Sequence, residues 1–273
     1  MMRDRYVRPI FAIGDSHCAP LNALVLFEAD GETPMAVGTS ICVQGLSGRT
    51  IVGASGELHP GVVAALAGFH LLSSVAKDYA GDRPAVDFAD RRFVASSIAA
   101  ASPVLFTIGE LDAREIIASI PLDADAQLPF EADLTALPAS GFVRTLPAAT
   151  LHERVLTDFR PIFAGLVGLI NLGVKRIALA SLPPPNPDDE EYRRITGIAS
   201  YARTRYKVHL LVNSILRTFC EQANIVFIDV WDAVTEANIA KPGVLIDGLH
   251  LGYDGARPTL RRFINAFAEA AVS

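Results

Sequence analysis

The chain has 273 residues, of which 51% are hydrophobic and 20% are charged, and its formal net charge is -6. This length supplies enough apolar material for a sizeable buried core. Acidic and basic residues are interspersed and no block rich in Lys or Arg occurs, which argues against a nucleic-acid partner or an anionic membrane surface. We therefore expect no nucleic acid and no membrane among the partners.

The first residues, MMRDRYVRPIFAIG, lack a secretory apolar segment followed by a small-residue cleavage site. The most apolar stretch elsewhere, residues 161–174, is too short and too rich in glycine to span a bilayer. These features predict a cytoplasmic protein. Cys18, Cys42 and Cys220 are odd in number and widely spaced, so we expect three reduced thiols and no disulfide framework.

Five short apolar runs predict buried strands, because each has the length of a strand and most are apolar on both faces. Helical patterns lie between them, and the clearest apolar stripe is Leu156, Phe159, Phe163, Leu166 and Ile170. This alternation favours an α/β protein, a three-layer α/β/α sandwich with a mostly parallel five-stranded sheet. The predicted strands are Pro9–Ile13, Ser40–Val43, Val104–Ile108, Arg176–Ala180 and Ile225–Val230.

We expect residues 1–273 to form one domain with two additions. Residues 22–38 predict a hairpin around Asp30 and Gly31. Residues 119–150 mix prolines, acidic residues and alanines, which indicates an insertion or a lid. Neither segment is long enough to be a separate domain.

Polar turns follow three of the predicted strands, where parallel sheets gather their ligands. The turns are GDSHCAP, QGLSGRT and GELDAR, and the first contains Ser16. A serine nucleophile needs a base, usually histidine, and a carboxylate that orients the base. Of six histidines, His250 is the best candidate, because Asp247 precedes it by three and side chains at that spacing can face each other.

Alone, Asp-x-x-His is more typical of a capped surface turn than of a catalytic pair. The order along the chain favours catalysis, since the serine follows the first predicted strand and the Asp and His follow the last. The other histidines are read as structural, capping or surface residues, with His70 and His209 inside helical patterns. No His, Cys and carboxylate cluster has metal-ligand spacing, so we expect no metal and no cofactor.

Four segments together resemble the SGNH hydrolase superfamily, also called the GDSL esterase/lipase group. FAIGDSH is similar to the first block of that family, VQGLSGRT to the second, GELDAR to the third and DGLH to the last. The matches run in order over residues 8–258. The resemblance implies a flavodoxin-like fold, with Ser16 as nucleophile, His250 as general base and acid, and Asp247 as the orienting carboxylate. It also implies an oxyanion hole formed by the N–H groups of Ser16 and Gly48.

The third block departs from the family pattern Gly-x-Asn-Asp, because Leu111 stands where an asparagine donor belongs. The form GELDAR is similar to that of a bacterial branch of the superfamily. Two interpretations stay open: Glu110, Asp112 and Arg114 brace the site as an ion-pair network, or Arg114 or His17 supplies the missing donor. The residues expected to support the site or contact substrate are Asp15, His17, Glu110, Asp112 and Arg114.

The resemblance implies cleavage of an ester through an acyl-enzyme. The expected substrate carries a short acyl or O-acetyl group, and a carbohydrate is one candidate for the alcohol portion. Two alternatives remain: a binding protein that keeps the fold without catalysis, motivated by the missing asparagine, and an acyltransferase with the same triad. The sequence does not indicate an oligomeric state.

Overall fold

The computed structural model describes residues 8–27, 31, 34–43, 46–52, 58–66, 103–138, 140–171, 174 and 176–269. The predicted hairpin turn at Asp30 and the helical pattern around His70 lie outside these residues. Within the described ranges, no helix combines the length and the apolar character that a bilayer crossing requires.

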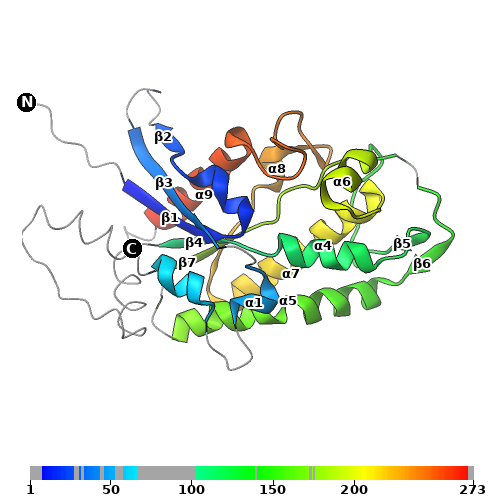
Figure 1. Ribbon diagram of the computed structural model, residues 1–273, viewed down its shortest axis with the longest axis horizontal. Coiled ribbons are helices and arrows are strands. Elements are labelled where there is room, and N and C mark those ends of the chain that lie inside the picture. Colours follow the sequence, from blue (N-terminus) through cyan, green and yellow to red (C-terminus); the bar gives the residue numbers. More distant parts are fainter. Residues whose placement is uncertain are drawn as a thin grey trace, which may run out of the picture.

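A six-stranded sheet forms the centre of the molecule (Figure 1). β1 pairs in parallel with β3 on one side and with β4 on the other, and β4, β7 and β8 continue the parallel run. All five predicted strands are present in the parallel part of the sheet. In spatial order the strands are β2 (Val25–Phe27), β3 (Pro34–Cys42), β1 (Arg8–Gly14), β4 (Val104–Thr107), β7 (Ile177–Ala180) and β8 (Val226–Ile228).

The prediction of five strands was one short, because β2 joins the main sheet as an antiparallel edge strand. β3 begins at Pro34, well before the predicted run at Ser40. Its first half therefore pairs with β2 as well as with β1, and its second half pairs with β1 alone. The hairpin segment is thus continuous with the sheet.

Helices cover both faces of the sheet, which gives the predicted three layers (Figure 1). One face packs against α1 (Gly48–Ile51), α4 (Glu110–Ser119), α5 (Ala148–Asn171) and α7 (Ala202–Ala223), and the other against η1 (Ser16–Leu21), α8 (Trp231–Val234) and α9 (Tyr253–Glu269). A helical segment at residues 60–66 lies on the same face as α1, α4, α5 and α7. α6 (Asp189–Thr196) follows the loop after β7.

The predicted stripe on α5 is only partly correct. Phe159 and Leu166 are buried, but Leu156 is 38% exposed. The predicted stripe shares Phe159 and Leu166 with the row that faces the core, but each of its other three members lies one position after a core residue. The fully buried row comprises Leu151, Val155, Phe159, Ile162, Leu166 and Leu169.

The segment 119–150 packs beside α7. It contains a parallel two-stranded sheet of β5 (Ala124–Ala126) and β6 (Arg144–Leu146). Lys207 of α7 forms a 2.6 Å ion pair with Asp125, and Arg203 donates to the carbonyls of Leu134 and Leu137. A short antiparallel pair, β9 (Thr235–Glu236) and β10 (Ile239–Ala240), lies next to it through a hydrogen bond from Asn238 to the Asp133 carbonyl.

The carboxyl end of β1 has no room for a side chain at Gly14. A Cβ there would lie 2.0 Å from Thr107 Oγ1 and 2.3 Å from the Thr107 carbonyl oxygen of β4. Gly14→Ala is therefore expected to force β1 and β4 apart and to lower the free energy of unfolding by about 1–3 kcal/mol or more. Urea denaturation measures the change.

Gly168→Ala is the matched control, because a Cβ at this position of α5 meets nothing within 4 Å. Alanine favours a helix over glycine, so this control is expected to raise stability by up to about 1 kcal/mol. Equal stability of the Gly14→Ala variant and the wild type would contradict the packing described for β1 and β4.

Candidate active site

Ser16 lies in a tight turn at the carboxyl end of β1. The Asp15 N–H donates to the Thr107 carbonyl at 3.2 Å, which fixes the turn to the end of β4. The Asp15 side chain accepts the His17 N–H at 2.9 Å and so caps η1, whose first residue is the exposed Ser16. β1 has β3 on one side and β4 on the other, so this turn occupies the topological switch point of the sheet.

The cysteine that follows this turn meets a second thiol. Cys18 Sγ lies 3.1 Å from Cys42 Sγ at the end of β3, although neither has a partner in a disulfide. Burial, together with the Cys42 thiol, raises the pKa of Cys18. All three thiols are free, as predicted, and the contact between Cys18 and Cys42 arises from the pairing of β1 with β3.

A compact loop before α9 carries Asp247 and His250. Asp247 Oδ1 accepts the backbone N–H groups of Leu249 and His250 at 3.0 and 2.8 Å. Gly248 adopts φ +77°, and a Cβ there would lie 2.7 Å from Asn186 Nδ2. Only glycine fits this position without strain, because side chains rarely adopt that backbone conformation.

The loop brings His250 between Asp247 and Ser16. His250 Nδ1 lies 2.7 Å from Asp247 Oδ2, and His250 Nε2 lies 2.8 Å from Ser16 Oγ. Burial raises the pKa of Asp247, but hydrogen bonds from the His250 N–H, its ring and the Leu249 N–H outweigh it and lower the pKa to about 2. The ionised carboxylate accepts the Nδ1 proton, which leaves the Nε2 lone pair for the Ser16 hydroxyl.

Gly48 stands at the start of α1, after the N-cap residue Ser47. The Ser47 N–H donates to Thr50 Oγ1 at 2.8 Å, and the Val43 N–H donates to the Gly14 carbonyl at 2.8 Å. The end of β3 is thus bonded directly to the residue that precedes the Asp15–Ser16 turn. The role of Gly48 as an oxyanion donor stays a prediction.

The third block folds into the first turn of α4. Gly109 adopts φ +115°, and α4 starts at Glu110, whose side chain is 4% exposed. Arg114 Nε donates to Glu110 Oε1 at 3.2 Å, which is the contact that the bracing interpretation requires. Asp112 is also buried, and Leu111 is half-buried.

The structure contradicts the interpretation of His17 as the missing oxyanion donor. Its Nδ1 lies 3.1 Å from Asp15 Oδ1. Its Nε2 is buried and turned to the interior. Neither ring nitrogen is therefore available to a substrate oxygen at Ser16.

Removing the Arg114 guanidinium is expected to destabilise the protein, because Glu110 would keep a buried charge without this ion pair. The Arg114 side chain is 17% exposed, so the expected loss from Arg114→Ala is about 1–3 kcal/mol, below that of a fully buried pair. Thermal and urea unfolding measure the loss. Full stability together with full activity in this variant would rule out both interpretations of Arg114.

Sequence reasoning missed a row of buried polar residues on α7. Arg205, His209 and Asn213 recur every fourth residue and are all buried. His209 Nδ1 lies 2.8 Å from the Pro183 carbonyl, and Asn213 bonds both backbone groups of Leu182. Their i, i+4, i+8 spacing was the available signal, since one helix face seldom carries three polar residues among apolar ones unless they are bonded.

Comparisons with known proteins find solved structures that resemble this chain, but no family model and no curated sequence that matches it. A GDSL-like lipase from Bacteroides thetaiotaomicron aligns at TM-score 0.46 and 11% identity, and the alignment covers 96% of this chain and 89% of the lipase. A carbohydrate acetylesterase from Sinorhizobium meliloti aligns at TM-score 0.37 and 14% identity over 97% of this chain and 99% of the acetylesterase. A member of the lipolytic G-D-S-L family from Veillonella parvula aligns at TM-score 0.42 and 13% identity over 96% of this chain and 99% of that protein. At these values the likeness assigns no activity to this protein.

Proposed function

We propose that this protein is an SGNH-type serine hydrolase that cleaves a short acyl ester. The observation that carries the proposal is the continuous contact from Ser16 Oγ to His250 and from His250 to Asp247, at 2.8 and 2.7 Å. A serine, an imidazole and a carboxylate in this order are the requirements for an activated hydroxyl nucleophile. Ser16 is exposed, so a substrate can reach it.

The geometry supports a two-step reaction. Ser16 Oγ attacks the acyl carbon while its proton passes to His250 Nε2, and the resulting imidazolium is stabilised by Asp247. The imidazolium then protonates the leaving alcohol as the ester bond breaks and the acyl-enzyme forms. In the second step a water gives a proton to His250 Nε2 as it attacks the acyl carbon. The imidazolium then returns that proton to Ser16 Oγ as the bond between Ser16 and the acyl group breaks, which releases the acid and restores Ser16.

A groove next to Asp247 favours a substrate whose alcohol portion is polar. It has a volume of about 750 Å³ and borders Asp247 and Gly248. Hydroxyl-rich alcohols such as carbohydrates match a lining with several hydrogen-bonding side chains. The polar and charged members of the lining are Asn186, Glu191, Arg194, Lys241 and Asp247.

A fluorophosphonate probe and a set of p-nitrophenyl esters test this proposal. We expect covalent labelling at Ser16, found by peptide mass spectrometry, and faster hydrolysis of the acetate than of the octanoate. Leu111 supplies no donor, which favours the rival function of a binding protein without catalysis. Absence of both labelling and hydrolysis in folded protein would support that rival.

A further inference from the structure

A second carboxylate–imidazole pair, formed by Asp15 and His17, lies next to His250 of the proposed triad. His17 Nδ1 lies 3.1 Å from Asp15 Oδ1, and both side chains are at least nine-tenths buried. The His17 ring centroid is 4.7 Å from that of His250, with 42° between the ring planes. The ring of the proposed general base therefore rests on another imidazole, and a carboxylate fixes the position of that imidazole.

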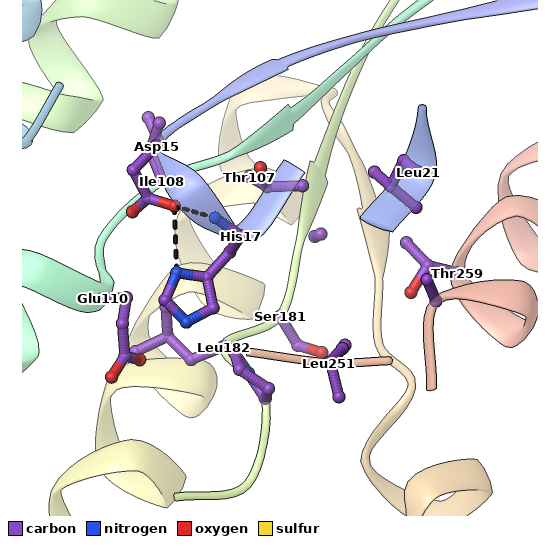
Figure 2. A pocket seen from close by; sticks show the side chains of 13 residues that line it. Asp15, His17, Leu21, Thr107, Ile108, Glu110, Ser181, Leu182, Leu251 and Thr259 are labelled. Carbon is purple, nitrogen blue, oxygen red and sulfur yellow. Dashed lines mark hydrogen bonds and ion pairs between the residues drawn. The ribbon is translucent and has the colours of Figure 1, made fainter. Parts of the chain in front are cut away.

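A small cavity of about 30 Å³ lies beside His17. Figure 2 shows one ring nitrogen of His17 turned to Asp15 and the other turned toward the side of the cavity where Glu110 lies. Within the described residues, His17 Nε2, Glu110 Oε2 and His209 Nε2 are buried and have no hydrogen-bond partner. His209 Nε2 lies 3.7 Å from Glu110 Oε2, beyond hydrogen-bonding distance.

These three atoms cannot satisfy one another while both rings are neutral. Asp15 accepts the Nδ1 proton of His17, and the Pro183 carbonyl accepts the Nδ1 proton of His209. Each neutral ring then has only a lone pair at Nε2, and a Glu110 carboxylate also only accepts. A buried group of acceptors is costly, so a further proton donor would stabilise the cluster. The buried hydroxyls of Thr107 and Tyr192 do not supply it, because neither makes a hydrogen bond to any described residue.

The charges around the cluster favour His17 as the site of that proton. Burial lowers the pKa of His17, but the hydrogen bond to Asp15 and the charges of Asp15 and Glu110 outweigh burial and the opposing Arg114, so the pKa is raised. Burial lowers the pKa of His209 and keeps that ring neutral. The groups that face His17 are Asp15 from the turn after β1, Glu110 and Arg114 from α4, His209 from α7 and His250 from the loop before α9.

We propose that His17 is a buried imidazolium held between Asp15 and Glu110, and that it is a positioning residue for His250. Glu110 then acts as a counter-ion of His17, which gives the third block a role other than oxyanion binding. The effect on catalysis rests on the proposed function, whereas the charge of His17 does not. The His17 ring, which Asp15 fixes, packs against the His250 ring and holds it in the orientation that faces Ser16.

The charge state is measured directly by titrating the histidine rings with long-range ¹H–¹⁵N spectra of the full chain. The His17 signals are identified by their loss in His17→Gln. We expect a His17 midpoint above the ordinary value of about 6.5. A midpoint at or below that value would overturn the proposal, because the further proton donor would then not be His17.

Glu110→Gln tests the counter-ion, because the amide keeps the shape and can donate to a neutral ring. The His17 midpoint is expected to fall by about one pH unit or more, the size of shift that loss of a close opposite charge produces. Glu115→Gln, on the exposed side of the same helix, is the control and should leave the midpoint unchanged. An unchanged midpoint in Glu110→Gln would overturn the role of Glu110.

The positioning role is tested by kcat per active site, with the sites counted by fluorophosphonate titration. His17→Phe keeps a ring against His250 but cannot bond Asp15, so kcat per titrated site is expected to fall on the order of 10- to 100-fold while KM stays near the wild-type value. His17→Gln is the second variant if His17→Phe does not fold. A purely structural role would lower the number of titrated sites and leave kcat per site unchanged, and that result would overturn the positioning role. If the wild type hydrolyses no ester, the proposed function fails while the ring titration still decides the charge of His17.

Discussion

Replacing His250 with alanine is expected to lower kcat for a small activated ester by at least about a thousandfold. The reason is the 2.8 Å contact between His250 Nε2 and Ser16 Oγ, which is the route by which the hydroxyl proton leaves. Without this base the serine hydroxyl is a poor nucleophile at neutral pH. Steady-state kinetics with p-nitrophenyl acetate measure the loss.

Ser16→Ala is expected to cost about as much as His250→Ala, and the double variant hardly more than either, because the two residues act as one unit. His152→Ala is the matched control, since His152 lies on α5 and should leave kcat unchanged. If the fold-losses in kcat of the two single variants multiply in the double variant, the two residues do not act as one unit. Unchanged kcat in both single variants would remove the triad.

The order of Ser16, Asp247 and His250 along the chain was enough to predict that these residues meet. Parallel strands end at one edge of their sheet, so a serine after the first strand and a histidine after the last can approach each other. The short Asp-x-x-His turn needs only local geometry, which its spacing reveals. The parallel strands were predictable for a similar reason, because their runs are apolar on both faces.

The role proposed for His17 was not predictable in the same way. It depends on Glu110 of α4 and His17 of η1 lining one cavity, and on His209 of α7 lying 3.7 Å from Glu110. No local pattern encodes that meeting. The predicted number of strands was too low for a related reason. β2 belongs to the sheet because it pairs with the first half of β3, which also pairs with β1, and this arrangement exists only in the folded sheet. The stripe on α5 was misassigned because two rows of that helix are apolar, and only tertiary contact selects one.

The second large effect concerns stability and arises at Arg205, whose side chain is 0% exposed. Its guanidinium donates to the carbonyls of Asn186 and Ser200 at 2.8 and 2.5 Å, and to Asp189 Oδ1 at 2.9 Å. It also stacks 4.3 Å from the centroid of the Tyr192 ring. This one side chain therefore ties α7 to the start of α6, to the segment that follows α6 and to the loop after β7.

Arg205→Met keeps much of the side-chain volume but leaves the buried carbonyls of Asn186 and Ser200 without this donor, whereas Asp189 is 39% exposed and still accepts the Ala202 N–H. The expected loss is about 2–5 kcal/mol of unfolding free energy, at about 1–3 kcal/mol for each buried carbonyl that loses its donor. Arg217→Met on the same helix is the matched control: Arg217 is 52% exposed and pairs with Asp229, so its loss should stay within about 1 kcal/mol. Urea unfolding of both variants at one pH measures the difference. Similar losses would mean that the loop between β7 and α6 keeps its shape without Arg205, and that apolar packing around Tyr192 holds α6 in place.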